Sequence, residues 1–466
     1  MKLQGTLARQ AQARMVDNLV ITLSNKEIQM SQQNQSVPGQ AWVTVFSGMA
    51  INLCLGILYA WSIWKSALVD VDMAGQTMTG INAGWTYLNN AQAATPFSLC
   101  VIMFALMMIP GGRIQDRISP KFGATIGGLT LAAGCIIAGL MKSYTGIVIG
   151  FGIIGGIGMG IGYAAPTPAA LKWFGPHKRG LIAGLVVGGY GGAALYIGGL
   201  GQYLINNYGI SGSFIGLGSF FAVVVVIAGQ MLKSPPEGYV APTLAGSGVA
   251  TSSSTVTNWE PADVVKTWQF YALLVMFILT TQSGLLIIGN AKGLMVSAAK
   301  GMPFFAANAW ILVSFGGLVN ALGRVGTGFY SDKIGRLNAY CLNCGVSALC
   351  LFSLPYIIST QSVALLFLAV GIAYWQYGGG LALMPSFAAD FFGPKNLGMN
   401  YGLIFIGWGL GVFVTRLAGT IQDVTGSLNY AFYLSGALLV AGVILAQMTS
   451  RPMHSTEVDG ETAAAQ

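Results

Sequence analysis

Long apolar runs separated by short polar connections dominate the chain from residue 42 onward. A helix needs about 20 apolar residues to cross a bilayer, at a rise of about 1.5 Å per residue. Twelve segments reach this length: 42–64, 89–111, 123–142, 145–171, 180–204, 212–232, 268–289, 304–329, 337–358, 362–389, 398–420 and 428–448. The runs are continuous, without the two-residue alternation of transmembrane β-strands. The pattern predicts an all-α polytopic membrane protein with twelve transmembrane helices.

Composition indicates the same class. Hydrophobic residues make up 54% of the chain and charged residues 8%, whereas soluble domains carry about 25% charged residues. So few charges cannot cover a water-exposed surface, and the 66 glycines suit helices that approach closely in lipid. The net charge of +8 is spread over short connections rather than gathered on a soluble module. We therefore expect a lipid bilayer around the protein and no nucleic-acid partner.

The basic residues are divided unequally between the two ends of the predicted bundle. The connections after spans two, four, six, eight and ten hold Arg113, Arg117, Lys121, Lys172, Lys178, Arg179, Lys233, Lys266, Lys333, Arg336 and Lys395. The opposite connections hold Lys65, Lys142, Lys292 and Lys300, with Arg416 near that side. Because cytoplasmic loops are enriched in Lys and Arg, we expect a cell (inner) membrane protein with both termini in the cytoplasm. Segments 1–41 and 450–466 are interpreted as cytoplasmic tails.

The chain divides into two similar halves. Residues 233–266 are rich in Gly, Ser, Thr and Ala and predict a flexible cytoplasmic linker between six-helix bundles at 42–232 and 267–449. GGRIQDRISPKFG after span two matches GTGFYSDKIGR after span eight, with the shared aspartates 216 positions apart (332 − 116). KWFGPHKRG and DFFGPKNLG follow spans four and ten, with their Gly-Pro pairs 218 positions apart (393 − 175). Parallel repeats of this kind are found in rocking transporters.

The first repeated motif resembles the loop signature of the major facilitator superfamily, and the resemblance extends over residues 40–450. It implies the major facilitator fold, in which two parallel-repeat six-helix bundles rock around a central site. The glycines permit close helix contact, and the charged residues can bond helix ends across the two halves. We expect a conformational latch formed by Gly112, Asp116, Arg117, Gly328, Asp332, Lys333 and Arg336.

Three further segments narrow the resemblance. LGILYAWSIWKSAL at 55–68, YAAPTPAALKWFGPHKRGLIAG at 163–184 and NALGRVGTGFYSDKIGR at 320–336 are similar to the oxalate/formate antiporter and monocarboxylate transporter families. This resemblance implies alternating-access transport of short organic anions. We expect neither a cofactor nor a metal, and the protein is expected to be a monomer.

Arg324 is the candidate for binding such an anion. It lies inside span eight, whereas the 14 acidic residues and the two histidines all fall in tails, loops or span ends. An embedded charge costs roughly 2.5–3.5 kcal/mol by insertion scales and usually faces a cavity or a partner. Since no embedded carboxylate is available, the expected partner is an anionic substrate, and the family resemblance also implies a substrate arginine here.

Other candidate substrate contacts surround this arginine. Asn320 precedes Arg324 by one helical turn and shares its face. Tyr163 and Tyr377 offer phenolic donors from opposite halves, and Tyr59 supplies an aromatic wall.

Trp408 occupies the place where the resemblance to oxalate carriers implies a second cation, a lysine. One central positive charge suits a monoanion, because a second carboxylate would be left desolvated and unpaired. The sequence therefore favours a monocarboxylate of lactate, pyruvate or formate size over oxalate.

The predicted function is secondary active transport of small organic carboxylates, by proton symport or by anion exchange. The alternatives are oxalate/formate-type dicarboxylate exchange, export of amphipathic compounds, and a non-transporting anion sensor. An embedded enzyme would need a nucleophile, a base or metal ligands at depth, and the apolar segments carry no such His/Asp/Glu cluster.

Overall fold

The computed structural model describes residues 37–174, 176–236, 239, 241, 258–393 and 396–452. The side chains of Asp116, residues 176–180 and Leu397 are not described either. The predicted N-terminal tail apart from residues 37–41, most of the predicted linker and the C-terminal tail beyond residue 452 lie outside the described residues.

Helices make up most of the N-terminal half, which we define as residues 39–231, and its longest described loop, 69–79, carries one partner of each of two isolated β-bridges. Its elements are α2 (Gly39–Leu55), η1 (Gly56–Ala60), α3 (Trp61–Leu68), η2 (Gly80–Asn82), α4 (Asn90–Arg117), α5 (Pro120–Met141), α6 (Tyr144–Ile147), η3 (Val148–Gly155), α7 (Gly156–Tyr163), α8 (Pro166–Leu171) and α9 (Pro176–Met231). The first span is built from α2, η1 and α3, and the fourth runs from α6 to α8.

The C-terminal half, residues 268–447, repeats this pattern after the short helix α10 (Pro261–Val264). Its elements are α11 (Trp268–Ala298), α12 (Pro303–Ala307), α13 (Trp310–Ile334), α14 (Arg336–Ser359), α15 (Val363–Phe392), α16 (Leu397–Leu410), α17 (Val412–Thr425) and α18 (Asn429–Gln447). Trp259, near the end of the predicted linker, already packs against this half, since its N–H donates to the carbonyl of Phe392 at 3.0 Å.

Eleven helical segments of the described chain are long and apolar enough to cross a membrane, and α9 accounts for two crossings. Its 56 residues would extend about 84 Å, far beyond the thickness of a bilayer. The helix is broken at Gly209, where φ is 70° and ψ is 179°. A Cβ there would lie 2.7 Å from the carbonyl oxygen of Ile81, and Asn82 Oδ1 accepts the N–H of Ile210 at 2.8 Å. The twelve predicted membrane helices and the all-α class are confirmed.

One predicted span is displaced. The sequence places span eight at 304–329, but Pro303–Ala307 form the separate helix α12, and the crossing helix α13 begins at Trp310 and continues to Ile334. Proline is favoured in the first turn of a helix, which explains the start of α12. Phe304, counted from the sequence as part of the span, is 64% exposed.

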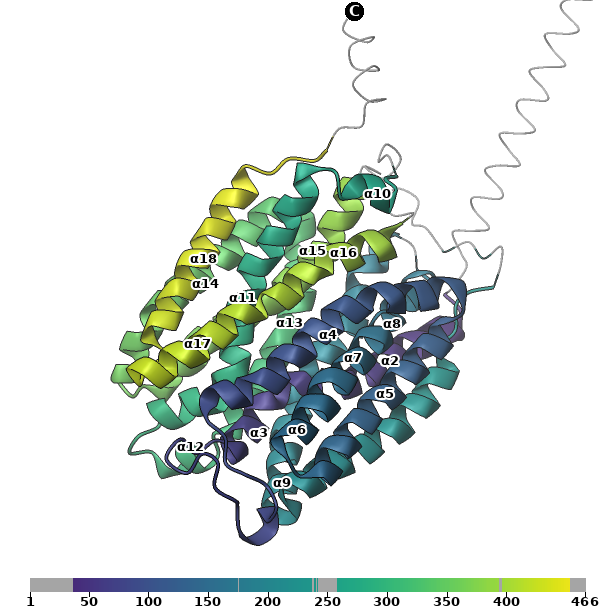
Figure 1. Ribbon diagram of the computed structural model, residues 1–466. Helices are drawn as coiled ribbons and strands as arrows, with labels where there is room; N and C mark the ends of the chain where they lie inside the picture. The colour runs from purple at the N-terminus through teal and green to yellow at the C-terminus, as the bar shows by residue number, and fades with distance from the viewer. Residues whose placement is uncertain are drawn as a thin grey trace, which may run out of the picture.

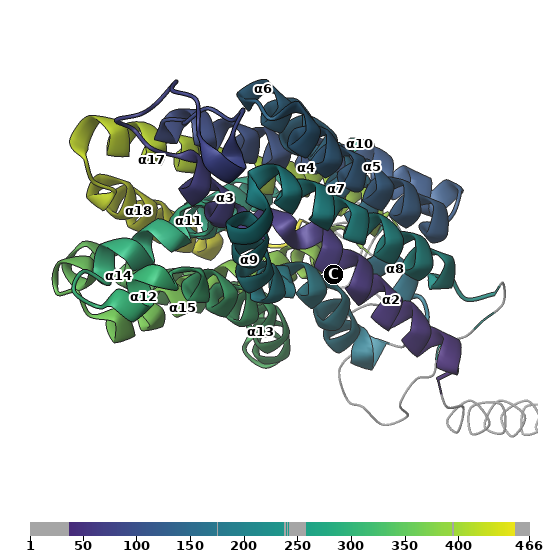
Figure 2. The same ribbon diagram turned by 90° about the horizontal axis from the view of Figure 1, so that it is seen from below.

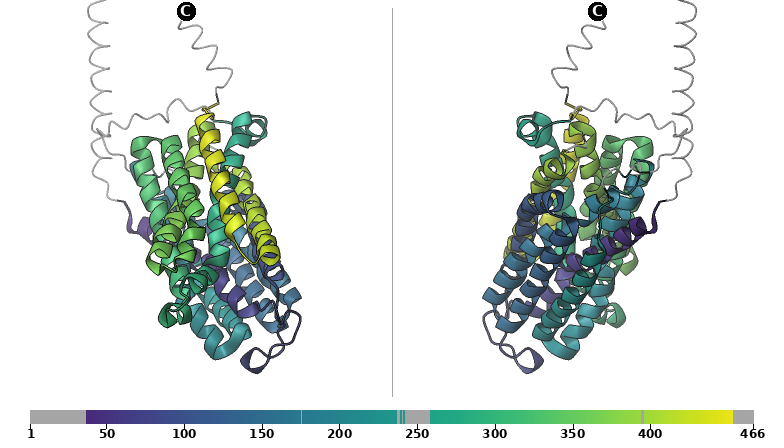
Figure 3. Two further views of the ribbon diagram at one scale, coloured as in Figure 1. Left: turned by 90° about the vertical axis from the view of Figure 1, so that its left-hand side faces the viewer. Right: turned by 90° about the vertical axis from the view of Figure 1, so that its right-hand side faces the viewer.

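The two halves lie side by side, as the purple-to-teal and green-to-yellow ribbons show (Figures 1 and 2). The loop after α3, helix α12 and the α17–α18 turn gather at one end, which we call the distal end (Figures 1 and 3). The described chain begins and ends toward the opposite, proximal end.

Glycines allow the halves to meet closely along two seams. At the first, between α9 and α13, a Cβ on Gly317 would lie 2.7 Å from the backbone nitrogen of Leu195. At the second, between α4 and α16, a Cβ on Gly409 would lie 2.5 Å from Ala105 Cβ. Helices in lipid associate through such small-residue contacts. The composition shows that glycine is abundant, and the structure shows where glycines bring the halves together.

Candidate functional site

Arg324 lies between the two halves, at the α9–α13 seam. Only 1% of its surface is exposed. Nε donates to Asn320 Oδ1 at 3.1 Å, one turn earlier on α13, as the shared face predicts. Across the seam, Nη1 donates to the carbonyl oxygen of Val187 at 3.1 Å and to Tyr163 OH at 3.5 Å, while Nη2 donates to Tyr59 OH at 3.2 Å. The guanidinium therefore bonds three elements of the opposite half.

Every acceptor in this set is neutral. Ion pairs between described side chains include Lys266 with Asp263 and Arg336 with Asp332 and Asp390, and none of these pairs includes Arg324. Burying a cation without a counter-charge is costly even when hydrogen bonds are made. The site thus holds a positive charge that a bound anion would neutralise.

A chain of hydroxyl and indole groups extends from Arg324 to the second seam. Tyr59 OH and Tyr377 OH are 2.9 Å apart, and Trp408 Nε1 donates to Tyr377 OH at 2.8 Å. Tyr59 OH also accepts from Arg324. Tyr59 and Tyr377 each carry one hydroxyl proton, and only one of these protons lies in the bond between the two oxygens. The other O–H can therefore donate to a third group. When Tyr377 is the donor in the phenol pair, the spare O–H is that of Tyr59, beside the guanidinium, where a carboxylate oxygen could accept from both.

The six predicted contact residues therefore meet in one hydrogen-bonded network: Arg324, Asn320, Tyr163, Tyr59, Tyr377 and Trp408. They come from both halves and from five membrane crossings. Their role as substrate contacts stays a prediction. Their convergence in one network depends on the fold, since they lie up to 349 positions apart in the sequence (408 − 59).

Aromatic rings that the sequence analysis did not single out enclose this network. The Phe104 ring lies 4.8 Å from Trp408 and 5.3 Å from Tyr163, and the Tyr190 ring lies 4.9 Å from Tyr59. An aromatic residue inside an apolar run has no distinguishing pattern, so the sequence could not separate these from ordinary packing residues. These rings pack around the hydrogen-bond partners of Arg324, whose own surface is 1% exposed in this conformation.

Two glycines also shape the site. A Cβ on Gly191 of α9 would lie 3.0 Å from both Arg324 Nε and Asn320 Oδ1. A Cβ on Gly378 of α15 would lie 2.2 Å from the Asn320 carbonyl oxygen. Asn320 is thus wedged between two helices, and its Nδ2 is buried without a hydrogen-bond partner. An unpaired buried donor costs free energy, and a bound acceptor would recover it.

The predicted latch residues lie at the proximal end. Asp332 pairs with Arg336 at 2.6 Å, and Arg336 Nε lies 3.6 Å from Asp390 Oδ2. Lys333 Nζ lies 4.5 Å from the centre of the Phe329 ring. These contacts join α13, α14 and α15 within the C-terminal half, whereas the sequence analysis expected bonds across the halves.

Fewer contacts are described for the predicted latch residues of the N-terminal half. Gly112 is the member that faces the other half, because a Cβ on it would lie 4.0 Å from the carbonyl oxygen of Gly398. Arg117 is exposed, a Cβ on Gly328 would meet no atom within 4 Å, and the side chain of Asp116 lies outside the described residues. The latch remains a prediction.

Two bundles of membrane-crossing helices that meet at a buried, unpaired cation define a two-bundle membrane transporter. The chain belongs to the Major Facilitator Superfamily, whose profile matches residues 41–382. The structure is similar to the xylose transporter XylE from E. coli, with a TM-score of 0.64 and 13% identity, covering 88% of this chain and 98% of that one. This likeness shows the fold alone.

Sequence relatives fall in the same superfamily. The chain is 26% identical over 374 residues to the uncharacterized MFS-type transporter YhjX of Escherichia coli K12, covering 79% of this chain and 85% of the relative. It is 26% identical over 376 residues to the oxalate:formate antiporter of Oxalobacter formigenes (80% and 82% covered). It is 24% identical over 368 residues to human monocarboxylate transporter 12 (74% and 70% covered). The predicted superfamily is confirmed, and with it the assignment as a transporter rather than an enzyme.

Proposed function

We propose that this transporter carries small organic carboxylates by alternating access. The observation that carries the proposal is Arg324, a fully buried guanidinium between the halves whose described partners are all neutral. A carboxylate can accept two parallel N–H bonds from a guanidinium, and this pairing is stronger than bonds to neutral acceptors. Two of the relatives are named for the transport of oxalate, formate or monocarboxylates, which supports the same class of cargo.

Monocarboxylates are the favoured substrates. Trp408 supplies an indole N–H to Tyr377 where a second cation would be needed to neutralise a dianion. A second carboxylate at this depth would be desolvated without an opposite charge. A cargo of lactate, pyruvate or formate size fits one guanidinium and one spare phenolic donor. Oxalate/formate-type exchange is the second candidate, because a relative is named for it.

The contacts of Arg324 suggest how binding and movement are linked. Arg324 belongs to the C-terminal half, while Tyr59, Tyr163 and Val187 belong to the N-terminal half. A substrate that accepts from Nη1 and Nη2 replaces bonds that now hold the halves together. Rocking of the two halves around the loaded site then exposes it to one end or the other. With the proximal end in the cytoplasm, as the positive-inside rule predicts, the distal end faces outward.

Energy coupling is by proton symport or by anion exchange. Asn320 stands where proton-coupled relatives are expected to have an acid, so a cotransported proton would travel with the substrate–Arg324 pair. Formate uptake into proteoliposomes, measured with and without an imposed pH gradient, separates the two mechanisms. Uptake that ignores the gradient but requires internal formate or oxalate indicates exchange.

The test of the function is Arg324→Ala in the purified, reconstituted protein. Uptake of radiolabelled formate, lactate, pyruvate and oxalate is expected to fall to background, because the positive charge of the central network is lost. Arg416→Ala is the matched control, since Arg416 lies in the same half but is exposed. Wild-type uptake by the Arg324 variant would overturn the proposal. Ligand stabilisation of the wild type without flux would instead indicate the anion sensor.

A further inference from the structure

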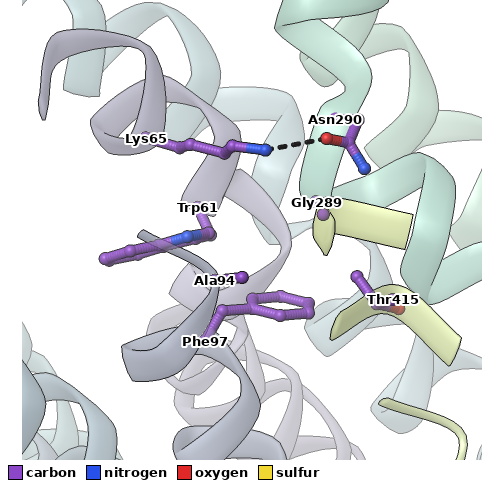
Figure 4. Close-up of a pocket in the computed structure, with 8 residues that line it drawn as sticks. Trp61, Lys65, Ala94, Phe97, Gly289, Asn290 and Thr415 are labelled. Atoms are coloured by element: carbon purple, nitrogen blue, oxygen red, sulfur yellow. Dashed lines mark hydrogen bonds between the residues drawn. The ribbon is translucent and has the colours of Figure 1, made fainter. Parts of the chain in front are cut away.

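Two lysines form reciprocal bonds between the halves near the distal end. Lys65 of α3 donates from Nζ to Asn290 Oδ1 of α11 at 2.8 Å (Figure 4). Lys292, two residues after Asn290, donates to Gln202 Oε1 of α9 at 2.8 Å. The first bond runs from the N-terminal half to the C-terminal half and the second runs the opposite way. Each half therefore contributes one lysine, from its first crossing, and one amide acceptor.

Neither lysine forms an ion pair with a described carboxylate, although Asp423 attracts Lys65 electrostatically at longer range. No carboxylate of the described residues lies within 4.0 Å of either amine. The carboxylate of Asp423, on α17 at the distal end, accepts from Asn90 Nδ2 at 3.0 Å. Lys65 and Lys292 are both partly buried cations held by neutral amides. A carboxylate is a stronger acceptor for an ammonium group than an amide oxygen, so it can compete for either lysine.

A small cavity lies beside the Lys65–Asn290 bond. Its volume is about 10 Å³, near the space of one water molecule, and Trp61, Phe97 and Thr415 are among the residues that line it (Figure 4). Thr415 is 5% exposed, and its buried Oγ1 has no hydrogen-bond partner. The cavity thus combines an ammonium group with an unused hydroxyl donor, beside the apolar rings of Trp61 and Phe97.

This cavity is displaced from the central site. Lys65 follows Tyr59 by six residues, which is about 9 Å along a helix toward the distal end. Thr415 follows Trp408 by seven residues in the same direction. None of the cavity-lining residues belongs to the network around Arg324. An anion that approaches from the distal end reaches Lys65 before it reaches Arg324.

We propose that Lys65, Thr415 and Asn290 form a second, distal carboxylate site that also acts as the gate between the halves. This inference rests on the proposed function and takes the same small carboxylates. The arriving carboxylate accepts from Lys65 Nζ and from the Thr415 hydroxyl, and it displaces Asn290 Oδ1. Displacement removes one of the two reciprocal bonds, and the Lys292–Gln202 and Asn90–Asp423 bonds remain between the halves. Anion binding therefore weakens the closed gate.

Binding is tested in a protein without the central charge. In Arg324→Gln, formate is still expected to raise the melting temperature of the purified protein, because the distal site is intact. Adding Lys65→Gln is expected to weaken this response to formate by roughly tenfold or more, as loss of a charge-assisted bond does. Adding Lys300→Gln instead is the matched control, since Lys300 is an exposed distal lysine, and it is expected to change nothing.

The outcomes separate this site from the proposed function. If Arg324→Gln alone removes both formate uptake and all stabilisation, the distal site is wrong and the proposed function stands. If formate stabilisation depends on Lys65 while wild-type vesicles show no flux, the distal site stands and the transport function is wrong. Equal responses in the Lys65 and Lys300 variants would also overturn the distal site.

Gating is tested with Gly419→Cys, because a Cβ at Gly419 meets no atom within 4 Å and lines the same cavity. A membrane-impermeant maleimide added from the distal side is expected to label this thiol faster when Lys65→Gln is also present. Asn290→Asp is a near-isosteric change with the opposite expected effect, because its carboxylate pairs permanently with Lys65. Labelling is expected to be slower in this variant, and formate, which is expected to speed labelling when Asn290 is present, is expected to have no effect. The parent protein without Gly419→Cys gives the background of native thiols. Unchanged labelling in both variants would refute the gate.

Discussion

Asn320→Asp is a near-isosteric change that places a carboxylate where an amide oxygen now accepts from Arg324. The distance from Asn320 Oδ1 to Arg324 Nε is 3.1 Å. Two unit charges at that separation interact by about 5 kcal/mol at an effective dielectric constant near 20. If the positive charge of Arg324 binds the substrate anion, the new aspartate acts as a permanent internal counter-ion. The substrate must then compete with this aspartate for Arg324.

The expected loss of transport is large. Each 1.4 kcal/mol is a factor of ten, so even half of the Coulomb energy weakens substrate binding by roughly a hundredfold. The folded protein should at the same time gain stability, because a buried uncompensated charge acquires a partner. The variant is therefore expected to show a raised melting temperature together with formate uptake at least about a hundredfold below wild type at low substrate.

The assay is formate uptake into proteoliposomes alongside thermal unfolding of the same preparation. Asn338→Asp is the matched control, because Asn338 is exposed at the proximal end of α14 and the same charge change there leaves Arg324 untouched. Uptake is measured without a proton gradient at neutral pH, where wild-type rates for Asn320→Asp would refute the view that Arg324 supplies the charge for the anion. A stabilised protein with normal uptake would place the substrate elsewhere.

Two further changes address the other members of the network. Tyr377→Phe removes the acceptor of the Trp408 indole and the partner of Tyr59, so unfolding is expected to become easier by about 1–3 kcal/mol and uptake to fall; unfolding and uptake equal to wild type would show that the phenol chain is unimportant. Trp408→Lys supplies the second cation and is expected to raise oxalate uptake relative to formate, with Trp408→Phe as the neutral control; an unchanged ratio would refute the single-charge explanation of substrate choice.

Part of the candidate site could be predicted from the chain alone because charge is so rare in it. Arg324 stood out as an embedded cation among apolar residues, and its helical periodicity placed Asn320 on the same face. Tyr190 and Phe104 could not be recognised, since one more aromatic residue in an apolar span carries no distinguishing pattern. Gly191 and Gly378 were equally hidden among 66 glycines, although each leaves room for Asn320.

The contacts of the two distal lysines could not be predicted from the sequence either. Lys65 and Lys292 were read from the sequence as sparse charges of the connections opposite the termini, and their sparseness correctly marked that end as poor in cations. Nothing in either segment indicated that each amine donates to an amide of the other half. Such bonds depend on which helices become neighbours, and the repeat structure alone does not fix the contacts of individual side chains.

The amino-acid sequence by itself determined that twelve helices cross a membrane in two repeated halves, because span length and the cost of burying charge in lipid act locally along the chain. It also singled out one embedded arginine, from which we predict an anionic substrate. Only the tertiary structure decided which neutral groups hold that arginine, where α9 breaks and which distal side chains join the halves. Those features arise where segments distant in sequence pack within hydrogen-bonding distance, and packing geometry is a property of the assembled bundle.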